Sequence, residues 1–516
     1  MVQYIRQWYY RGSLDSCNYS CNYCPFSKKH KCSREELAED EKSLAGFVDN
    51  VIKKAEESKK KCAVQIVPYG EALIHKYYWR ELARLTCSPY IEAAGAQTNL
   101  SFDVNCMAGE FMEYNGDFGK LRLWCTFHPQ MVEMDSFLQQ CQKLSGYRIL
   151  YCVGTVGVPA QAGIIKRLRE KLPADVYLWI NKMDGLKRRY TEEETRIFSG
   201  IDEYFETGLK HYKADTSKCT DSLFTEADGS VRRCNTCIPG KDGTACTRKE
   251  CSCYLSYCNQ QVPELVFFNP YPAFRIPNYP EAVFFDVDGT LLGSGDRIIT
   301  ENTVKWLKRL SAHSRIFLAT SLPYRDALRK TAPAADIISG GVFAHGGICV
   351  TNKGTGTLHK KIYPLKYKET DALKENAGRY GYNVHIYNGR PEGSAEKEIY
   401  KITLSPRTIN KIPAATQDKR ARSAAVKLGL LDKDAGVNVI IEDGCIQLTS
   451  TMAGKREGIL HICNIMGYKP EDIAVFGNSA SDVPMLKEFG FSVAVNAGRE
   501  ARQAANYCIR SGLLHA

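Results

Sequence analysis

Two stretches of the chain, residues 1–213 and 281–516, alternate short apolar runs with longer segments that mix apolar and charged residues. Short apolar runs bounded by polar residues predict buried strands, and apolar residues spaced three and four apart predict amphipathic helices. Repeated strand–helix alternation favours a parallel sheet, so we predict a parallel α/β barrel, or part of one, for the first stretch. Its expected strands lie at residues 64–67, 121–126, 149–153 and 176–180.

The second stretch predicts a separate α/β domain that carries an insertion. Residues from about 366 to 445 interrupt its strand pattern with strand candidates of their own. We therefore predict an α+β cap inserted into a domain formed by residues 281–516. The expected strands of the domain are 281–285, 315–319 and 472–476, and those of the cap are 382–387, 399–404 and 437–441.

The segment between the two stretches differs in composition. Residues 214–262 are rich in Cys, Asp, Gly, Thr and Lys and poor in long apolar runs. Such a segment can hardly bury a core unaided, so we expect a metal to organise it. Residues 263–280 contain five prolines, which predicts a linker.

Composition narrows the class of protein. A chain of 516 residues predicts two or three domains. We find no apolar run long enough to cross a bilayer and no signal-peptide core at the start, so we expect a cytoplasmic protein without a membrane partner. The net charge of +11 is typical either of solvated helix faces or of a protein that attracts phosphorylated ligands. Without a recognised nucleic-acid-binding motif, a nucleic-acid partner is not expected.

The 21 cysteines are many for a chain of this kind, and in a reducing compartment they are thiols or metal ligands. Three of them form the motif Cys17-x3-Cys21-x2-Cys24, with Tyr23 before the last. Three thiolates can hold a cuboidal iron–sulfur cluster and leave its fourth iron open for a ligand. The alternatives are an incomplete zinc site or three unrelated thiols. The motif resembles that of the radical S-adenosylmethionine (SAM) superfamily, over about residues 5–213.

This resemblance implies a partial (β/α) barrel, a 4Fe–4S cluster, SAM, and an external electron donor similar to flavodoxin or ferredoxin. It implies that Tyr23 lies near the adenine of SAM. Gly70 and Glu71 follow a strand and resemble the Gly-Gly-Glu motif that binds the methionyl amino group, with tyrosine in place of the first glycine. Asn99 and Asn181 are candidates for ribose contacts, or else ordinary polar residues at strand ends. The implied reaction is reductive cleavage of SAM and hydrogen abstraction from an unknown substrate.

The cysteine-rich segment contains Cys219, nine further residues, Gly229, four further residues and Cys234. This spacing resembles the opening of the SPASM and twitch extensions that follow radical SAM domains and hold auxiliary iron–sulfur clusters. The resemblance implies Cys219, Cys234, Cys251 and Cys253 as ligands. A structural zinc knuckle is the alternative, since zinc also accepts tetrahedral thiolate sites.

Polar residues in the second α/β stretch follow the ends of its predicted strands or begin the helix after them. Open α/β sheets place their ligand sites at these carboxyl ends. The motif Asp286-Val-Asp288-Gly-Thr-Leu and the polar motifs that follow it along the chain resemble those of the haloacid dehalogenase (HAD) superfamily, over residues 281–516. This resemblance implies a Rossmann-like domain. The residues concerned are Asp286, Asp288, Thr320, Lys455, Asn478 and Asp482.

The HAD resemblance implies phosphate-ester hydrolysis with Mg²⁺. Asp286 is the expected nucleophile and Asp288 the expected acid and base. Thr320 and Lys455 are expected to hold the phosphoryl oxygens. Mg²⁺ prefers oxygen ligands, and the expected ones come from Asp286, Asp288 and Asp482.

Asn478 stands where many family members have aspartate, so we expect it to be a weaker metal ligand. A catalytically inactive HAD domain that senses a phosphorylated ligand is therefore an alternative. Our leading interpretation is a bifunctional enzyme in which radical SAM chemistry is coupled to hydrolysis of a small phosphorylated metabolite. A peptide-modifying radical SAM enzyme is the other alternative.

Overall fold

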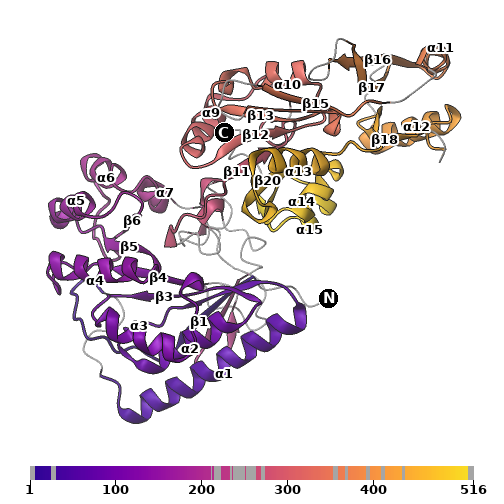
Figure 1. Cartoon of the computed structure of the whole chain (residues 1–516). Coiled ribbons are helices and arrows are strands. Elements are labelled where there is room, and N and C mark those ends of the chain that lie inside the picture. The colour runs from indigo at the N-terminus through magenta and orange to yellow at the C-terminus, as the bar shows by residue number, and fades with distance from the viewer. Residues whose placement is uncertain are drawn as a thin grey trace. The chain divides into compact units, whose positions relative to one another are not determined.

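The computed structural model describes two compact units, Met1–Asn278 and Tyr279–Ala516 (Figure 1). The described residues are 6–24, 31–210, 212–213, 222–232, 235, 250–251, 263–268, 274–293, 295–352, 358–365, 370–390, 396–407, 413–432 and 436–509.

The first unit is built on a sheet of the order β6-β5-β4-β3-β2-β1-β8-β9. Strands β1 to β6 are parallel and neighbour one another in chain order, and the four predicted strands of this part are confirmed as β2, β4, β5 and β6. The strands are β1 (Gln7–Gly12), β2 (Cys62–Ile66), β3 (Ile91–Thr98), β4 (Leu121–Thr126), β5 (Leu150–Val156), β6 (Leu178–Asn181), β8 (Ser222–Glu226) and β9 (Val231–Arg232). The short strands β7 (Tyr212–Lys213) and β10 (Glu250–Cys251) pair separately.

Helices follow the strands of this sheet and bury their apolar faces against it (Figure 1). The longest begins with a capping box in which Ser33 and Glu36 satisfy each other's backbone N–H groups, and its residues Leu44, Val48 and Val51 are fully buried. Caps of this kind stabilise a helix start by about 1 kcal/mol. The helices are α1 (Arg34–Ser58), α2 (Lys76–Cys87), α3 (Val104–Glu113), α4 (Met134–Gly146), α5 (Ala162–Lys171), α6 (Glu192–Ser199) and α7 (Phe205–Leu209).

The segment expected to be a linker contributes to the core of the first unit. Phe268, Phe274 and Ile276 join a cluster with Trp124 and Trp179 of the sheet. The two indoles stack with centroids 4.3 Å apart. The described part of this segment, which includes the 3-10 helix Pro263–Phe268, is therefore packed, and burial of its apolar side chains holds it in place.

The second unit has a sheet of the order β15-β14-β13-β12-β11-β20-β21-β22. The six strands from β13 to β22 run parallel, and β14 and β15 add antiparallel pairs at one edge. The predicted strands are confirmed as β11, β12 and β20. The strands are β11 (Ala282–Phe285), β12 (Arg315–Ala319), β13 (Ile338–Phe343), β14 (Ile348–Asn352), β15 (Leu358–Ile362), β20 (Ile473–Gly477), β21 (Phe491–Val495) and β22 (Tyr507–Ile509).

Both faces of this sheet are covered. Apolar residues of α13, α14 and α15 form a cluster with alternate residues of the strands, and Trp306 of α9 packs on Phe285 and Phe476 from the other face. Burial on two faces explains why these strands are almost continuously apolar. The helices are α9 (Glu301–Ser311), α10 (Tyr324–Lys330), α13 (Lys455–Met466), α14 (Val483–Glu488) and α15 (Arg499–Ala504).

The expected cap is a four-stranded antiparallel sheet of the order β16-β17-β19-β18. Two helices bury residues against one face of this sheet. The sheet runs on to Ser450, beyond the expected end near residue 445, because β19 is one of its strands. The elements are α11 (Thr370–Arg379), β16 (Tyr382–Gly389), β17 (Glu398–Pro406), α12 (Ala414–Lys427), β18 (Val437–Glu442) and β19 (Cys445–Ser450).

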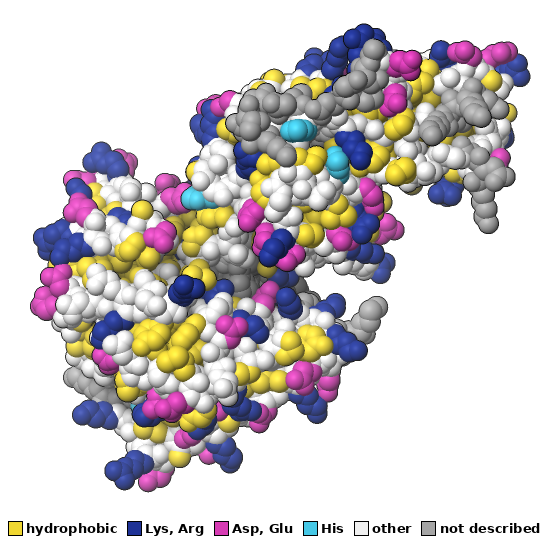
Figure 2. All heavy atoms as spheres, viewed as in Figure 1, with side chains coloured by type: hydrophobic (Ala, Val, Ile, Leu, Met, Phe, Trp, Pro, Cys, Tyr) yellow, Lys and Arg dark blue, Asp and Glu magenta, His cyan; other side chains and the backbone are white. Residues whose placement is uncertain are grey.

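The apolar length of the helices and the distribution of surface charge are relevant to the partners expected from the sequence. None of the described helices is long and apolar enough to span a membrane. On the face drawn in Figure 2, Lys and Arg side chains are interspersed with Asp and Glu over both units. The visible charge is therefore mixed in sign, which is typical of solvated helix faces.

Candidate functional site

The loop after β1 carries the three clustered cysteines to a cavity of about 210 Å³ at the carboxyl ends of the parallel strands. A turn in which Cys24 N–H donates to the carbonyl of Cys21 (3.1 Å) folds the loop. The cavity is lined by every residue predicted for the N-terminal site: Cys17, Cys21, Tyr23, Cys24, Gly70, Glu71, Asn99 and Asn181. The structure thus brings together residues that are widely separated along the chain.

Gly70 packs directly against the cysteine loop. Its N–H donates to the carbonyl of Leu14 (2.9 Å), and the next N–H, of Glu71, donates to the carbonyl of Ser16 (3.0 Å). A Cβ atom on residue 70 would lie 2.0 Å from the Ser16 carbonyl oxygen. Glycine is therefore required for this close approach of two backbones.

Glu71 is a buried junction between two loops. Its carboxylate accepts hydrogen bonds from the Thr98 hydroxyl (2.7 Å) and from the N–H groups of Leu73 (3.1 Å) and Asn99 (2.6 Å). Burial raises the pKa of Glu71 to about 7, although these hydrogen bonds favour the charged form. Asn99 in turn places its Nδ2 3.7 Å from the Cys17 sulfur, so the loop after β3 also supports the cysteine loop.

His128, which sequence reasoning missed, contacts the aromatic residue of the cysteine motif. Its Nδ1 lies 2.9 Å from the hydroxyl of Tyr23, and burial lowers the pKa of His128 to about 4. The imidazole is therefore neutral at pH 7. His128 follows the end of β4 as Asn99 follows the end of β3, so its position after a strand was the available sequence signal.

Burial favours the protonated form of two of the three thiols. Burial raises the pKa of Cys21 to about 11 and also raises that of Cys17. Within the described residues, no group of three His, Cys, Asp or Glu side chains is arranged to hold a single metal ion.

Of the cysteines predicted to bind an auxiliary cluster, Cys251 is described. It lies against a small apolar cluster formed by Tyr9, Val67 and Phe224. The other three, Cys219, Cys234 and Cys253, lie outside the described residues.

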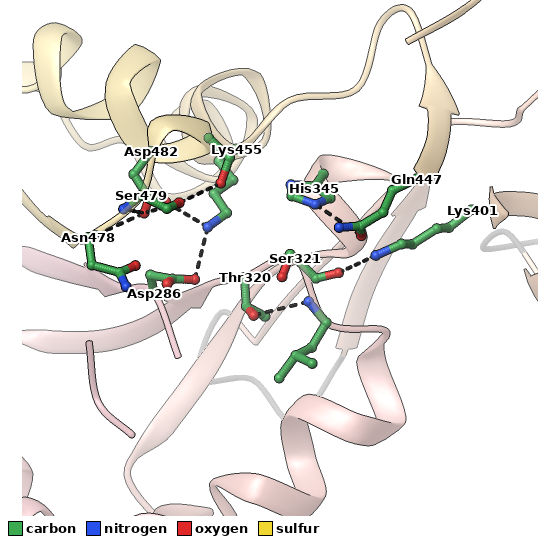
Figure 3. A network of polar contacts seen from close by, with 12 residues as sticks. Asp286, Thr320, Ser321, His345, Lys401, Gln447, Lys455, Asn478, Ser479 and Asp482 are labelled. Atoms are coloured by element: carbon green, nitrogen blue, oxygen red, sulfur yellow. Dashed lines mark hydrogen bonds and ion pairs between the residues drawn. The ribbon is translucent and has the colours of Figure 1, made fainter. Parts of the chain in front are cut away.

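The second site lies at the carboxyl ends of β11 and β20 (Figure 3). Asp286, Lys455 and Asp482 are almost fully buried, and Lys455 Nζ lies 2.9 Å from Asp286 Oδ1 and 2.6 Å from Asp482 Oδ1. Although burial lowers the pKa of Lys455, the two carboxylates raise it above its ordinary value. Burial raises the pKa of Asp286 and Lys455 opposes that rise. The three groups form one charged network.

Asp482 also shapes the turn that carries Asn478. Its Oδ2 accepts from the N–H groups of Asn478 (2.9 Å) and Ser479 (3.0 Å). A Cβ on Gly289, which has φ +79°, would lie 2.0 Å from Asn478 Nδ2. The amide of Asn478 is therefore held beside the loop of the first motif (Figure 3).

Thr320 and Asp288 are placed differently from the buried network. Thr320 is buried at the end of β12, and its hydroxyl accepts from Leu322 N–H (3.1 Å). Asp288 is partly exposed, and its carboxylate pairs with Lys330 Nζ at 2.6 Å. Its side chain is thus engaged by α10 in this structure rather than by the network around Asp286.

Cap residues that sequence reasoning missed reach the same strand ends. Lys401 of β17 donates to the carbonyl of Ser321 (2.6 Å), and Gln447 Oε1 of β19 lies 3.2 Å from His345 Nε2 (Figure 3). Lysine in the middle of an otherwise apolar strand was the available signal for Lys401. His345 has φ +53°, a strained backbone conformation that often marks a functional position.

The fold and site define a capped α/β domain whose strand ends hold a carboxylate–lysine network. Residues 283–512 match the family of haloacid dehalogenase-like hydrolases, and this C-terminal part of the chain is therefore a HAD-superfamily phosphatase-like domain.

The chain is also similar to individual proteins. A phosphoglycolate phosphatase of Methanococcoides burtonii is 24% identical over 232 residues, which are 45% of this chain and 90% of that protein. A phosphoserine phosphatase of Albidiferax ferrireducens is 40% identical over 60 residues, 12% of this chain and 25% of that protein. A solved haloacid dehalogenase-like hydrolase from B. subtilis covers 46% of this chain and 96% of its own, at 14% identity and a TM-score of 0.37.

The HAD family implies Mg²⁺, and the donor set of the second site fits that ion. The carboxylates of Asp286 and Asp482 each contact Lys455 Nζ through Oδ1, so the two side chains lie beside each other. Carboxylate and amide oxygens are the ligands that Mg²⁺ prefers. Asp286, Asp482 and Asn478 are the residues that would hold it, whereas the Asp288 side chain is directed to Lys330.

Proposed function

We propose that this chain is a bifunctional enzyme. Its C-terminal domain hydrolyses the phosphate ester of a small metabolite, and its N-terminal unit performs radical SAM chemistry on the same compound or on a related one. The observation that carries the first half is the buried Asp286–Lys455–Asp482 network in a domain of the HAD superfamily. The observation that supports the second half is the convergence of the predicted site residues on one cavity.

In the hydrolase half, the carboxylate of Asp286 attacks phosphorus, the bond to the leaving oxygen breaks, and an aspartyl phosphate forms. Asp288 gives its proton to the leaving oxygen and later takes one from the water that hydrolyses the aspartyl phosphate. Thr320 and Lys455 hold the phosphoryl oxygens. Mg²⁺ held by Asp286, Asp482 and Asn478 would supply further neutralisation of phosphoryl charge when bound.

Phosphate release from p-nitrophenyl phosphate and from phosphoglycolate tests the hydrolase half. Two of the relatives act, by name, on phosphoglycolate and phosphoserine, and both compounds are small phosphate esters. We expect Mg²⁺-dependent release that is lost in Asp286→Asn and kept in Asp296→Asn, a matched change at an exposed position. Release that survives Asp286→Asn would refute this half. Ligand binding without turnover in the unaltered protein would instead favour a sensor domain.

In the N-terminal half, the loops that follow β1, β2 and β3 support one another around the cavity. Gly70 and Glu71 hold the backbone ahead of Cys17, and Asn99 approaches its sulfur. A 4Fe–4S cluster on Cys17, Cys21 and Cys24, with SAM, would supply one-electron chemistry that removes a hydrogen atom from a substrate. The chain's own residues orient the ligands and enclose the cavity, and reduction requires an external donor similar to flavodoxin or ferredoxin.

Iron content and SAM cleavage test this half. Anaerobically reconstituted protein is expected to bind iron and, with a reductant, to convert SAM to 5′-deoxyadenosine. The Cys17/Cys21/Cys24→Ala variant is expected to lose that product. Iron retained by the triple variant would support an auxiliary cluster in residues 214–262, and a variant without any iron would refute the auxiliary cluster.

A further inference from the structure

The cap sheet directs one polar face toward the core of its domain. Ile402 and Leu404 of β17 belong to the apolar cluster between the cap sheet and its helices. Because side chains alternate along a strand, Lys401 and Thr403 lie on the opposite face. Gln447 is the partner of Thr403 in the ladder, so it shares that face with Lys401.

Lys401 is a buried lysine that forms no ion pair with a carboxylate in the part of the chain that the structure describes. Lys401 is 3% exposed. Among the described residues, the Ser321 carbonyl is the one acceptor that its Nζ reaches. An ammonium group has three N–H donors, and a buried charge is unfavourable unless it is paired. Burial lowers the pKa of Lys401 to about 7; Glu442 opposes this and Lys455 adds to it.

The contacts of this polar face lead to the strand end that carries Thr320. Ser321, whose carbonyl binds Lys401, is the next residue, and the N–H of His345 donates to the carbonyl of Thr320 (3.1 Å). His345 Nε2 also contacts Gln447 Oε1. Burial, together with the charges of Lys401 and Lys455, lowers the pKa of His345 well below its ordinary value, so the imidazole is neutral.

Figure 3 shows that these cap contacts lie on one side of Thr320 and that Asp286 lies on the other. A phosphoryl group attacked by Asp286 and held by Thr320 has its leaving group on the side of the cap. In that position the leaving group meets Lys401. Lys455 is paired with two carboxylates, whereas Lys401, among the described residues of the site, has a backbone carbonyl as its acceptor.

We propose that Lys401, Gln447 and His345 form a subsite for the leaving group of the phosphate ester, and that this subsite takes an anion, either a carboxylate or a second phosphate. The inference rests on the proposed hydrolase function and names its substrate class. An anionic leaving group supplies an ion-pair partner, which Lys401 does not have among the described residues, and Gln447 supplies an amide donor. A phosphate ester whose leaving group is uncharged gains neither of these charge-assisted contacts.

Matched substrates test the subsite. Phosphoglycolate and 2-hydroxyethyl phosphate have nearly the same size, but only the first has a carboxylate in its leaving group. Propane-1,3-diol bisphosphate tests a second phosphate in the same position. In the unaltered protein we expect kcat/KM for one anionic ester to exceed that for the neutral ester by roughly 10- to 100-fold, since hydrogen bonds to charged groups are the stronger ones.

Lys401→Gln is expected to lower kcat/KM for the preferred anionic ester by roughly 10-fold more than for 2-hydroxyethyl phosphate, and so to remove the preference. Lys419→Gln, at an exposed position of α12 in the same cap, is expected to keep the preference. Equal losses for all three esters in Lys401→Gln would mean that the lysine only supports the fold, and would overturn the inference.

Binding separates failure of the subsite from failure of the hydrolase function. The dissociation constants of phosphoglycolate and 2-hydroxyethyl phosphate are measured by calorimetry on Asp286→Asn, with and without Lys401→Gln. If no ester is hydrolysed but phosphoglycolate binds more tightly and loses that advantage with Lys401→Gln, the subsite stands and the hydrolase function fails. If phosphoglycolate, 2-hydroxyethyl phosphate and propane-1,3-diol bisphosphate, measured in the same way, all bind alike, the subsite is refuted whatever the activity.

Discussion

Replacing Asp40 with alanine tests how the cysteine loop is supported. Asp40, 1% exposed on α1, accepts hydrogen bonds from the hydroxyls of Tyr78 (2.6 Å) and Tyr77 (2.9 Å). It also accepts from the backbone N–H of Ser13 (3.1 Å), at the start of the loop that leads to Cys17. Asp40→Ala removes all of these bonds at once.

The magnitude follows from where each donor lies. The Tyr78 side chain is fully buried, so its hydroxyl would be left without a partner, and Tyr77 is partly buried. Ser13 is exposed, so water replaces its lost bond. A buried donor left unsatisfied costs about 1–3 kcal/mol, and relief of the buried charge of Asp40 offsets part of the loss. We expect the free energy of unfolding of the first unit to fall by about 2–4 kcal/mol.

Urea unfolding followed by tryptophan fluorescence measures this loss. Trp8, Trp79, Trp124 and Trp179 report on the first unit. We expect a midpoint lower by roughly 1 M. Tyr78→Phe, which removes one bond, should cost about 1 kcal/mol. Glu57→Ala, at an exposed position of the same helix, is the control, and an Asp40→Ala midpoint equal to that of Glu57→Ala would refute the account.

Three further predictions concern the two sites. Gly70→Ala should lower the iron bound after anaerobic reconstitution several-fold, because the new Cβ meets the Ser16 carbonyl. The control Gly109→Ala, which has open space around the new Cβ, should bind as much iron as the unaltered protein. Equal iron in the two variants would contradict this prediction. Asp286→Asn should lower phosphate release by about 10³-fold or more without changing the melting temperature by more than a few degrees, as measured by colorimetric phosphate assay and calorimetry. Lys401→Met should stabilise the second unit by several kcal/mol at pH 6 and by less at pH 9. The pKa of Lys401 falls to about 7 on folding, so between pH 7 and the ordinary lysine pKa the unfolded chain binds more protons than the folded chain. The stability of the unaltered protein therefore rises with pH in this range, and the advantage of the Met variant shrinks. Chemical unfolding of the Lys401→Met variant at the two pH values checks the last prediction, and equal stabilisation at both would refute it.

Residues that follow buried strands could be predicted from the sequence. Short apolar runs locate several strands of each sheet, and polar residues such as Asn99, Asp286 and Thr320 come directly after strands. Because the carboxyl ends of parallel strands meet at one edge of a sheet, sequence spacing alone indicates that such residues lie close together.

Contacts between distant segments could not be predicted in this way. Lys401 and Ser321 are separated by 80 positions, and His345 and Gln447 by 102, so their contacts depend on how the cap lies over its sheet. The prolines after residue 262 indicated a linker, but Arg275 is fully buried over the ring of Trp179 at 4.8 Å. Packing of this kind depends on tertiary shape, which local composition does not contain.

Formation of 5′-deoxyadenosine is the most direct test of the central claim that one chain carries both a radical site and a phosphatase-like domain. Anaerobically reconstituted protein is incubated with SAM and dithionite, and the product is quantified by liquid chromatography. The account predicts the product in the unaltered protein and in Asp286→Asn, and none in Cys21→Ala. Absence of the product from unaltered protein that has bound iron, or equal amounts in Cys21→Ala, would contradict the claim.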